Sequence, residues 1–442
     1  MKKIVTRCFV GVMVFFMASI FLRFFTQKVL IEILHMNNDF TQIVFFDKPV
    51  SEESVINNIN WAKLYPFQNN DTVKINKPII FKERISGIEE KIEKYTKGYL
   101  VNRMNFVKSA VRYEKLIGWN LLNGDVYDLG DGWLTELVKK VEILPSQSEQ
   151  NVHGITTPAT ALYEFNGFLA NLDIDFLYVQ SPHKISKEDK IIGASDFSNE
   201  NADELLKALS LRHIPYLDLR ENIRQENRDH HSLFYKTDHH WKAETGLWAA
   251  GIIAQYLNAN NGFNIDLDAF KPEQYRYDLY ENWFLGSAGR KVTLLQTPPE
   301  DIGLIYPRFN TSFSLKIPSR NIDAEGAFDI FYDYRQVNEI DYYNLNPYGA
   351  YLYRDAPNVI IRNNFLHDNQ RILVIKDSFV NCVNPFLSLG IEYVDVLDIR
   401  HFTGSVKTYI KQNKPDMVIV MYNPDVIQTP DYTTHTSIFD FR

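Results

Sequence analysis

The sequence predicts an α/β protein built on a sheet of parallel strands with flanking helices. From about residue 157 onward, short apolar runs alternate with amphipathic stretches, and from about residue 371 the alternation follows a regular β-α-β-α-β order. Strands joined in this order lie parallel in one sheet, connected by right-handed crossovers. A hydrophobic content of 45% and a charged content of 23% are typical of a folded globular chain.

The elements of the middle part follow from their periodicity and length. Helices are predicted for residues 159–172, 202–212 and 241–258, and strands for residues 176–180 and 215–219. Earlier in the chain, residues 131–134 indicate a turn that leads into a strand or helix. Residues 260–365 are rich in Tyr and Asn and are interpreted as an irregular insertion, whose most turn-like piece is 285–290.

The C-terminal part carries the clearest pattern. Strands are predicted for residues 371–375, 393–397 and 417–422, and helices for residues 379–389 and 405–412. Open α/β sheets bind ligands at the carboxyl ends of their strands. The residues directly after Ile375 are therefore candidates for a functional site.

The N-terminus carries an apolar run without charges at residues 8–22, preceded by Lys2, Lys3 and Arg7 and followed by Arg23. Because the two flanking arginines can snorkel, the usable length approaches the roughly 20 residues of a membrane span. No small-x-small cleavage site follows. We therefore expect an uncleaved N-terminal transmembrane anchor, with the rest of the chain outside the cytoplasm.

Three segments are expected along the chain. Residues 1–27 are the membrane anchor, residues 28–115 a membrane-proximal stalk with entry helices at 85–97 and 100–115, and residues 116–442 the α/β domain. The net charge of −8 argues against a nucleic acid partner, which requires a basic stripe. No cysteine–histidine zinc spacing occurs, and neither a metal nor a cofactor is expected.

Ser378 lies at the junction between a predicted strand and a predicted helix. A hydroxyl at this place is exposed at the sheet edge, and the free N–H groups of the helix's first turn can hold an oxyanion. A capping role for Asp377 or Ser378 explains the same residues, since both types are favoured at helix starts.

Asp238 and His240 are two positions apart, so in an extended segment their side chains face the same way and His239 faces the other. A carboxylate beside an imidazole fixes its tautomer and stabilises the imidazolium. With Ser378 they supply the three parts of serine acyl chemistry. A rival interpretation uses metal, because the triplets at 229–231 and 238–240 both read Asp-His-His, and both residue types ligate zinc or manganese.

The segment 237–241, Thr-Asp-His-His-Trp, followed by Gly246 and a helix, resembles the signature of the bacterial DHHW protein family. That family is related to the SGNH-like domains of the alginate O-acetyltransferases. The segment 375–379, Ile-Lys-Asp-Ser-Phe, is similar to a later part of the same family, with looser matches at 102–103, 131–134, 182–184 and 286–287.

The resemblance implies an SGNH-hydrolase-like fold and assigns three catalytic roles. Ser378 is the nucleophile, His240 the general base and Asp238 its orienting partner. Lys376 stands where SGNH enzymes in general carry Gly. The expected oxyanion donors are the Ser378 N–H and, second, Gly286. Further candidates for contacts with the oxyanion or the substrate are Ser287, Lys376 and Trp241.

The function that follows is O-acyl transfer, chiefly of acetyl groups, to a cell-surface or exported polysaccharide through an acyl-serine intermediate. Because acetyl-CoA is absent outside the cell, a transferase needs acyl groups delivered by an integral membrane partner, as the resemblance implies. The alternatives are a carbohydrate esterase of the same fold, a metal-dependent Asp/His phosphoesterase and a non-catalytic glycan-binding protein.

Overall fold

The computed structural model describes residues 111–112, 114, 121–122, 126–141, 143, 157–191, 194–294, 296–427 and 438–442. The chain divides into two units, Met1–Ser109 and Ala110–Arg442, and the described residues lie in the second. The expected anchor and nearly all of the expected stalk, entry helices included, fall outside them. None of the helices in the described part has the length and apolar character that crossing a membrane requires.

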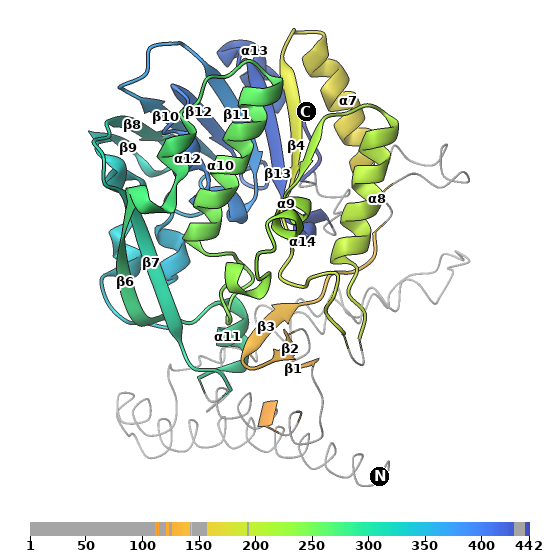
Figure 1. Cartoon of the computed structure of the whole chain (residues 1–442), viewed down its shortest axis with the longest axis vertical. Coiled ribbons are helices and arrows are strands. Elements are labelled where there is room, and N and C mark those ends of the chain that lie inside the picture. Colours follow the sequence, from red (N-terminus) through yellow and green to blue (C-terminus); the bar gives the residue numbers. More distant parts are fainter. Residues whose placement is uncertain are drawn as a thin grey trace, which may run out of the picture. The chain divides into compact units, whose positions relative to one another are not determined.

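A mixed sheet of eight strands organises the described residues (Figure 1). Its order is β5-β4-β13-β11-β12-β10-β8-β9. The first five strands in this order, from β5 through β4, β13 and β11 to β12, run parallel to their neighbours. The pairings of β12 with β10, of β10 with β8 and of β8 with β9 are antiparallel. The strands are β4 (Asp175–Gln180), β5 (Tyr216–Asp218), β8 (Phe313–Ile317), β9 (Ile322–Gly326), β10 (Asn358–Asn363), β11 (Arg371–Lys376), β12 (Tyr393–Leu397) and β13 (Met417–Tyr422).

Helices cover both faces of this sheet, which explains why its central strands are apolar throughout. Leu373 and Ile375 of β11 face the cluster formed with α7 (Pro158–Ala170), α8 (Ser198–Leu211) and α13 (Val406–Asn413). Ile372 and Val374 face the opposite cluster, formed with α9 (Leu219–Gln225) and α10 (Ala243–Asn260). In Figure 1, α10 lies in front of the strands.

The structure corrects the expectation of an irregular insertion at 260–365. Three of its strands, β8, β9 and β10, extend the main sheet, so the sheet is mixed rather than all parallel. Two others, β6 (Tyr275–Phe284) and β7 (Glu300–Pro307), form an antiparallel ribbon. The turn-like piece at 285–290 instead begins a short helix, α11 (Ser287–Val292).

The helix expected at 379–389 is also corrected, because it is split into the 3-10 turn η9 (Ser378–Cys382) and the helix α12 (Asn384–Leu387). Pro385 has no N–H to continue the first hydrogen-bond ladder, so a new helix starts there. The turn expected at 131–132 is present and joins β2 (Val126–Gly130) to β3 (Trp133–Glu136). These two strands and β1 (Leu121–Leu122) form a small sheet of their own.

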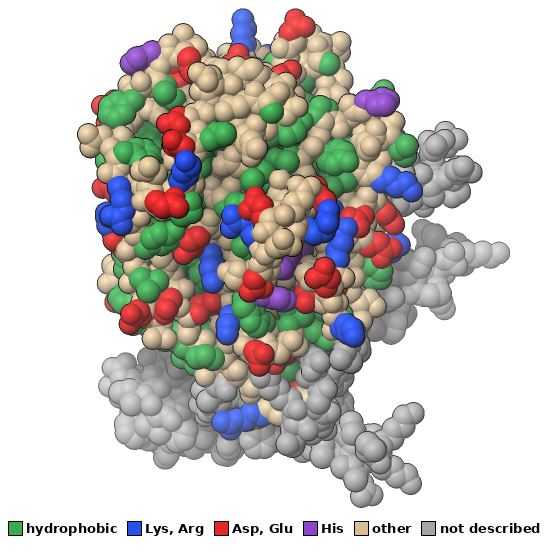
Figure 2. Space-filling view, viewed as in Figure 1, with side chains coloured by type: hydrophobic (Ala, Val, Ile, Leu, Met, Phe, Trp, Pro, Cys, Tyr) green, Lys and Arg blue, Asp and Glu red, His purple; other side chains and the backbone are tan. Residues whose placement is uncertain are grey.

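The described surface mixes both charge signs. In Figure 2, lysine and arginine side chains are interspersed with aspartate and glutamate on the face shown, and histidine side chains reach the surface among them. The acidic and basic side chains form no single-sign stripe on this face of the described residues.

Candidate active site

Ser378 lies immediately after β11, at the carboxyl edge of the sheet. The capping role falls to Asp377, whose Oδ1 accepts the Phe379 N–H at 2.8 Å, while its Oδ2 accepts the Asn423 N–H at 2.5 Å. Because the Asp377 side chain already caps this turn, the Ser378 hydroxyl is available for a hydrogen bond to another residue. Among the hydrogen bonds of the described residues, none is donated by the Ser378 N–H.

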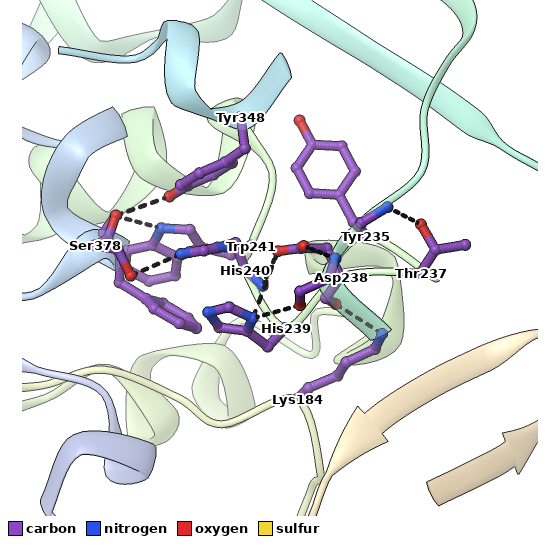
Figure 3. A network of polar contacts seen from close by, with 12 residues as sticks. Lys184, Tyr235, Thr237, Asp238, His239, His240, Trp241, Tyr348 and Ser378 are labelled. Carbon is purple, nitrogen blue, oxygen red and sulfur yellow. Dashed lines mark hydrogen bonds and ion pairs between the residues drawn. The ribbon is translucent and has the colours of Figure 1, made fainter. Parts of the chain in front are cut away.

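His240 bridges Asp238 and Ser378 (Figure 3). Its Nδ1 lies 2.5 Å from Asp238 Oδ1, and its Nε2 lies 2.7 Å from Ser378 Oγ. The carboxylate can only accept, so it fixes the tautomer with hydrogen on Nδ1 and leaves Nε2 to accept the serine proton. The predicted convergence of these three residues, which lie up to 140 positions apart in the chain, is therefore present in the structure.

The turn that carries Asp238 and His240 is held at both ends. The Tyr235 N–H donates to the His240 carbonyl at 3.2 Å, and the Lys242 N–H donates to the Leu233 carbonyl at 2.9 Å. Between these contacts the backbone bends, and it is not an extended strand. The bend lets the Asp238 carboxylate accept the backbone N–H of His240 at 3.0 Å as well as the ring nitrogen.

The Asp238 carboxylate is almost completely buried, with 2% of the residue exposed. Burial alone would raise the pKa of this carboxyl, but the neighbouring His240 and His239 and the Ser287 N–H hold the pKa well below its usual value. The Ser287 N–H donates to Asp238 Oδ2 at 2.6 Å. Asp238 is therefore ionised at neutral pH, and hydrogen bonds to both of its carboxylate oxygens fix its orientation.

Gly286 and Ser287 support this carboxylate rather than an oxyanion. The Gly286 N–H donates to Thr237 Oγ1 at 2.9 Å, which corrects the expectation that it points at a reacting carbonyl. A Cβ built on Gly286 would lie 2.6 Å from the Asp238 Cα, so only glycine permits the observed approach. Ser287 provides its N–H to Asp238, and its hydroxyl lies 3.0 Å from His239 Nδ1.

His239 does not face away from the site, which corrects the argument from strand alternation. The centres of the His239 and His240 rings are 3.8 Å apart, and 28% of the His239 side chain is exposed. The alternation rule fails here because the segment bends. Burial, and then the neighbouring His240, lower the pKa of His239.

Two further candidates lie beneath the site instead of facing a substrate. Trp241 is fully buried, and its Nε1 donates to the Phe379 carbonyl at 2.8 Å, so it supports the turn that carries Ser378 from the core. Lys376 is 1% exposed, and its Nζ lies 3.2 Å from carboxylate oxygens of Asp355 and Asp398. A lysine committed to two carboxylates is a structural cation rather than an oxyanion donor.

Lys184 is a positioning residue that the sequence did not single out. Lys184 is fully buried, and its Nζ donates to the carbonyls of Leu134, Lys236 and Asp238 at 2.5, 2.7 and 2.9 Å. Three acceptors match the three donors of an ammonium group. Burial lowers the pKa of Lys184, and Glu300 and Asp238 oppose that shift. The only sequence signal was its place in the loosely matching segment 182–184.

Tyr348 was also missed, because it lies in the Tyr-rich segment that showed no regular pattern. Its ring stacks on His240 with 3.8 Å between the centres and 18° between the planes. Its hydroxyl donates to the Ser378 carbonyl at 3.2 Å (Figure 3). Tyr348 therefore holds His240 and the turn that carries Ser378 together.

The contacts of the histidines bear on the metal interpretation. Both His240 nitrogens are engaged, one by Asp238 and one by Ser378. The histidines of the triplet at 229–231 are engaged as well, since His230 Nε2 donates to the His183 carbonyl and His231 Nε2 lies 3.0 Å from Asp189 Oδ1. Among the described residues, Asp238, His239 and His240 come within ligand distance of one another, and Asp355, Asp398 and His401 form a second such group. There, however, the cations Lys376 and Arg400 already neutralise the two carboxylates.

Two family models match the chain. Residues 130–281 match the SGNH hydrolase-like domain of acetyltransferase AlgX, and residues 211–397 match the DHHW protein model. The resemblance to the DHHW proteins and to the SGNH-like acetyltransferase domains is thereby confirmed. No curated protein matches by sequence.

Solved structures share the fold. PatB1 of Bacillus cereus is 20% identical, with a TM-score of 0.55, and the match covers 72% of this chain and 99% of PatB1. The same protein with a sulfonyl adduct gives 21% identity and a TM-score of 0.54 over the same shares of both chains. A DHHW family protein from Eubacterium siraeum is 15% identical, with a TM-score of 0.51, covering 70% of this chain and 93% of that one.

Proposed function

Because residues 211–397 match the DHHW proteins and residues 130–281 an SGNH-like acetyltransferase domain, we propose that this protein is an O-acyltransferase with Ser378 as its nucleophile. The observation that carries the proposal is the continuous contact from Asp238 through His240 to the Ser378 hydroxyl. The acetyltransferase description of the matching SGNH-like domain supports an acetyl group as the acyl group, and the acceptor that we propose is a polysaccharide hydroxyl.

The chemistry proceeds in two halves. His240 Nε2 takes the Ser378 proton as Oγ attacks the acyl carbonyl, and the ionised Asp238 stabilises the imidazolium that forms. The Ser378 N–H is placed to donate to the oxyanion. When the tetrahedral intermediate collapses, His240 returns the proton to the leaving group and an acyl-serine remains.

In the second half, a sugar hydroxyl gives its proton to His240 Nε2 and attacks the acyl carbon. The bond to Ser378 Oγ then breaks, and the serine recovers its proton from His240. Water in place of the sugar makes the enzyme a carbohydrate esterase, which uses the same residues. The acceptor in the second half is the sole difference between the two activities.

The location belongs to the proposal as well. We place the catalytic unit outside the cytoplasm on the strength of residues 1–27, with an integral membrane partner supplying acyl groups. Protease treatment of intact cells tests this placement: the catalytic unit should be cleaved while a cytoplasmic marker survives. Recovery of the protein in the cytoplasmic fraction would refute it.

The decisive experiment compares the wild-type protein with Ser378→Ala. Incubation with 4-nitrophenyl acetate should produce an acetylated peptide containing Ser378 by mass spectrometry, and a burst of nitrophenol. The variant should show neither, while its free energy of unfolding should change by only about 1 kcal/mol, the value of one lost hydrogen bond. PatB1 has been solved with a sulfonyl adduct, so a sulfonyl fluoride is a suitable second probe of the same hydroxyl.

The metal-dependent alternative gives the opposite pattern. Turnover that survives in Ser378→Ala but is lost on adding a chelator would replace the serine mechanism with metal chemistry. A wild-type protein that binds oligosaccharide but never forms an acyl-enzyme would instead identify a non-catalytic glycan-binding protein.

A further inference from the structure

A second histidine–carboxylate pair lies at the same sheet edge as the proposed nucleophile. His183 follows β4 and Asp425 follows β13, and His183 Nε2 is 3.2 Å from Asp425 Oδ1. The His183 side chain is 1% exposed, whereas 21% of the Asp425 side chain is exposed. The proposed mechanism uses neither residue.

Hydrogen bonds tie this pair to the nucleophile turn. β13 lies between β11 and β4, with Met421 opposite both Lys376 and Val179. Beyond the strands, the Asn423 N–H donates to Asp377 at 2.5 Å. Asn423 in turn accepts the Asp425 N–H on its Oδ1 at 2.8 Å. The residue beside Ser378 and the Asp425 backbone are therefore held by one asparagine.

The charge state of the pair follows from its contacts. The Ile185 N–H donates to His183 Nδ1 at 3.2 Å, so Nδ1 carries the lone pair and Nε2 carries the hydrogen. The Nε2 atom lies 3.2 Å from Asp425 Oδ1 without forming a hydrogen bond, so the pair is held by electrostatic attraction. Burial opposes ionisation of Asp425, but His183, His239 and His240 lower the pKa of this carboxyl. Asp425 is thus an anion within electrostatic reach of both histidines of the site.

Neither carboxylate oxygen of Asp425 accepts a hydrogen bond from a described residue, although Oδ1 lies 3.2 Å from His183 Nε2. Oδ1 is buried toward His183, so the exposed part of the side chain lies on the Oδ2 side. Among the described residues, none donates a hydrogen bond to Oδ2. An ionised carboxylate can only accept, and an accepting oxygen exposed at the sheet edge that carries Ser378 suits a hydroxyl donor on a ligand.

We propose that Asp425 accepts a hydrogen bond from a second hydroxyl of the acceptor sugar and so orients the hydroxyl that attacks acyl-Ser378. His183 is the positioning residue that fixes the carboxylate. The inference rests on the proposed function and adds the basis of acceptor choice: polyols with neighbouring hydroxyls are selected over simple alcohols and water. The attacking hydroxyl still passes its proton to His240, so the balance of the transfer step is unchanged.

The test measures acceptor choice from one acyl-enzyme. The full chain is acetylated with 4-nitrophenyl acetate in the presence of a methyl glycoside and ethanol together, and the two acetylated products are quantified. In Asp425→Asn, the ratio of glycoside ester to ethyl ester should fall roughly tenfold or more, as expected for losing a charged hydrogen-bond partner. His183→Gln should move the ratio in the same direction.

The matched control is Asp323→Asn on β9, where 69% of the aspartate side chain is exposed and its partner is Lys316. The control should leave the ratio at the wild-type value. A ratio that is unchanged in Asp425→Asn, or an equal fall with both acceptors, would overturn the proposal. If the wild-type protein forms no acyl-Ser378, the burst of nitrophenol is missing, which distinguishes this outcome from a changed product ratio. That outcome would refute the proposed function, and this inference with it.

Discussion

At the scale of single residues, the site depends on how completely Asp238 is engaged. Its Oδ1 accepts the His240 ring and backbone N–H groups, its Oδ2 accepts Ser287, and its carbonyl accepts Lys184. A buried carboxylate with donors on every side is held in one orientation and stays ionised. His240, the base of the proposed mechanism, is thereby held in one orientation by Asp238.

His239 is the residue whose expected behaviour changes most on inspection of the fold. Because its ring packs on His240 at 3.8 Å and its Nδ1 meets Ser287, His239→Ala should slow acylation of Ser378 by roughly tenfold, far less than His240→Ala. Stopped-flow measurement of the nitrophenol burst checks this. A burst rate equal to that of the wild type would show that the ring packing does not position the base.

At the scale of elements, the start of α11 is a structural support for the turn at 237–240. The Gly286 backbone lies so close to Asp238 that an added Cβ must displace it. Gly286→Ala should therefore lower the free energy of unfolding by about 1–3 kcal/mol and reduce acylation as well.

Gly303 in β7 provides the matched control for this substitution. A Cβ there would meet Tyr277 Cδ1 at 4.0 Å, which is an ordinary contact. Gly303→Ala should change the free energy of unfolding by less than about 1 kcal/mol. Urea denaturation and the burst assay are run on both variants. Equal behaviour of the two would mean that the close approach at Gly286 is not needed.

Lys184 acts on the same turn from the opposite side. It joins β3, through Leu134, to the carbonyls of Lys236 and Asp238. The small sheet that contains β3 is therefore tied to the functional turn by the buried Lys184 side chain, and also by the Leu134 N–H, which donates to the Lys236 carbonyl at 2.8 Å. A buried amine with all three hydrogens engaged rigidifies the elements that it joins.

At the scale of the whole molecule, Asp377 couples stability to pH. Burial raises the pKa of its carboxyl to about 6 from the usual 3.8, against the opposing effect of Arg400. Between these values the folded chain binds a proton that the unfolded chain has released. The contribution of this group to the free energy of unfolding is therefore full below pH 4. It is lost as the pH rises through 6, and its size is on the order of 3 kcal/mol.

The variant Asp377→Asn removes this titration. Its free energy of unfolding, relative to the wild type, should rise by about 3 kcal/mol between pH 4 and pH 7. Urea denaturation at several pH values measures the difference directly. Parallel curves for the two proteins across that range would contradict the raised pKa.

The sequence by itself determined the parts of this protein that rest on local pattern. The strands expected at 393–397 and 417–422 have those bounds in the structure, and Asp238, His240 and Ser378 were selected by residue type and spacing. Apolar runs and strand–helix junctions are short-range features, so they can be read along the chain.

Only the tertiary structure decided the contacts between distant segments. β8 to β10 join the main sheet by pairing across the chain, and Ser287 meets Asp238 from 49 positions away. His183 and Asp425 become neighbours only because β4 and β13 are adjacent and parallel. Such contacts depend on which strands are neighbours and on backbone N–H groups, which every residue except proline has. No residue pattern marks them in advance.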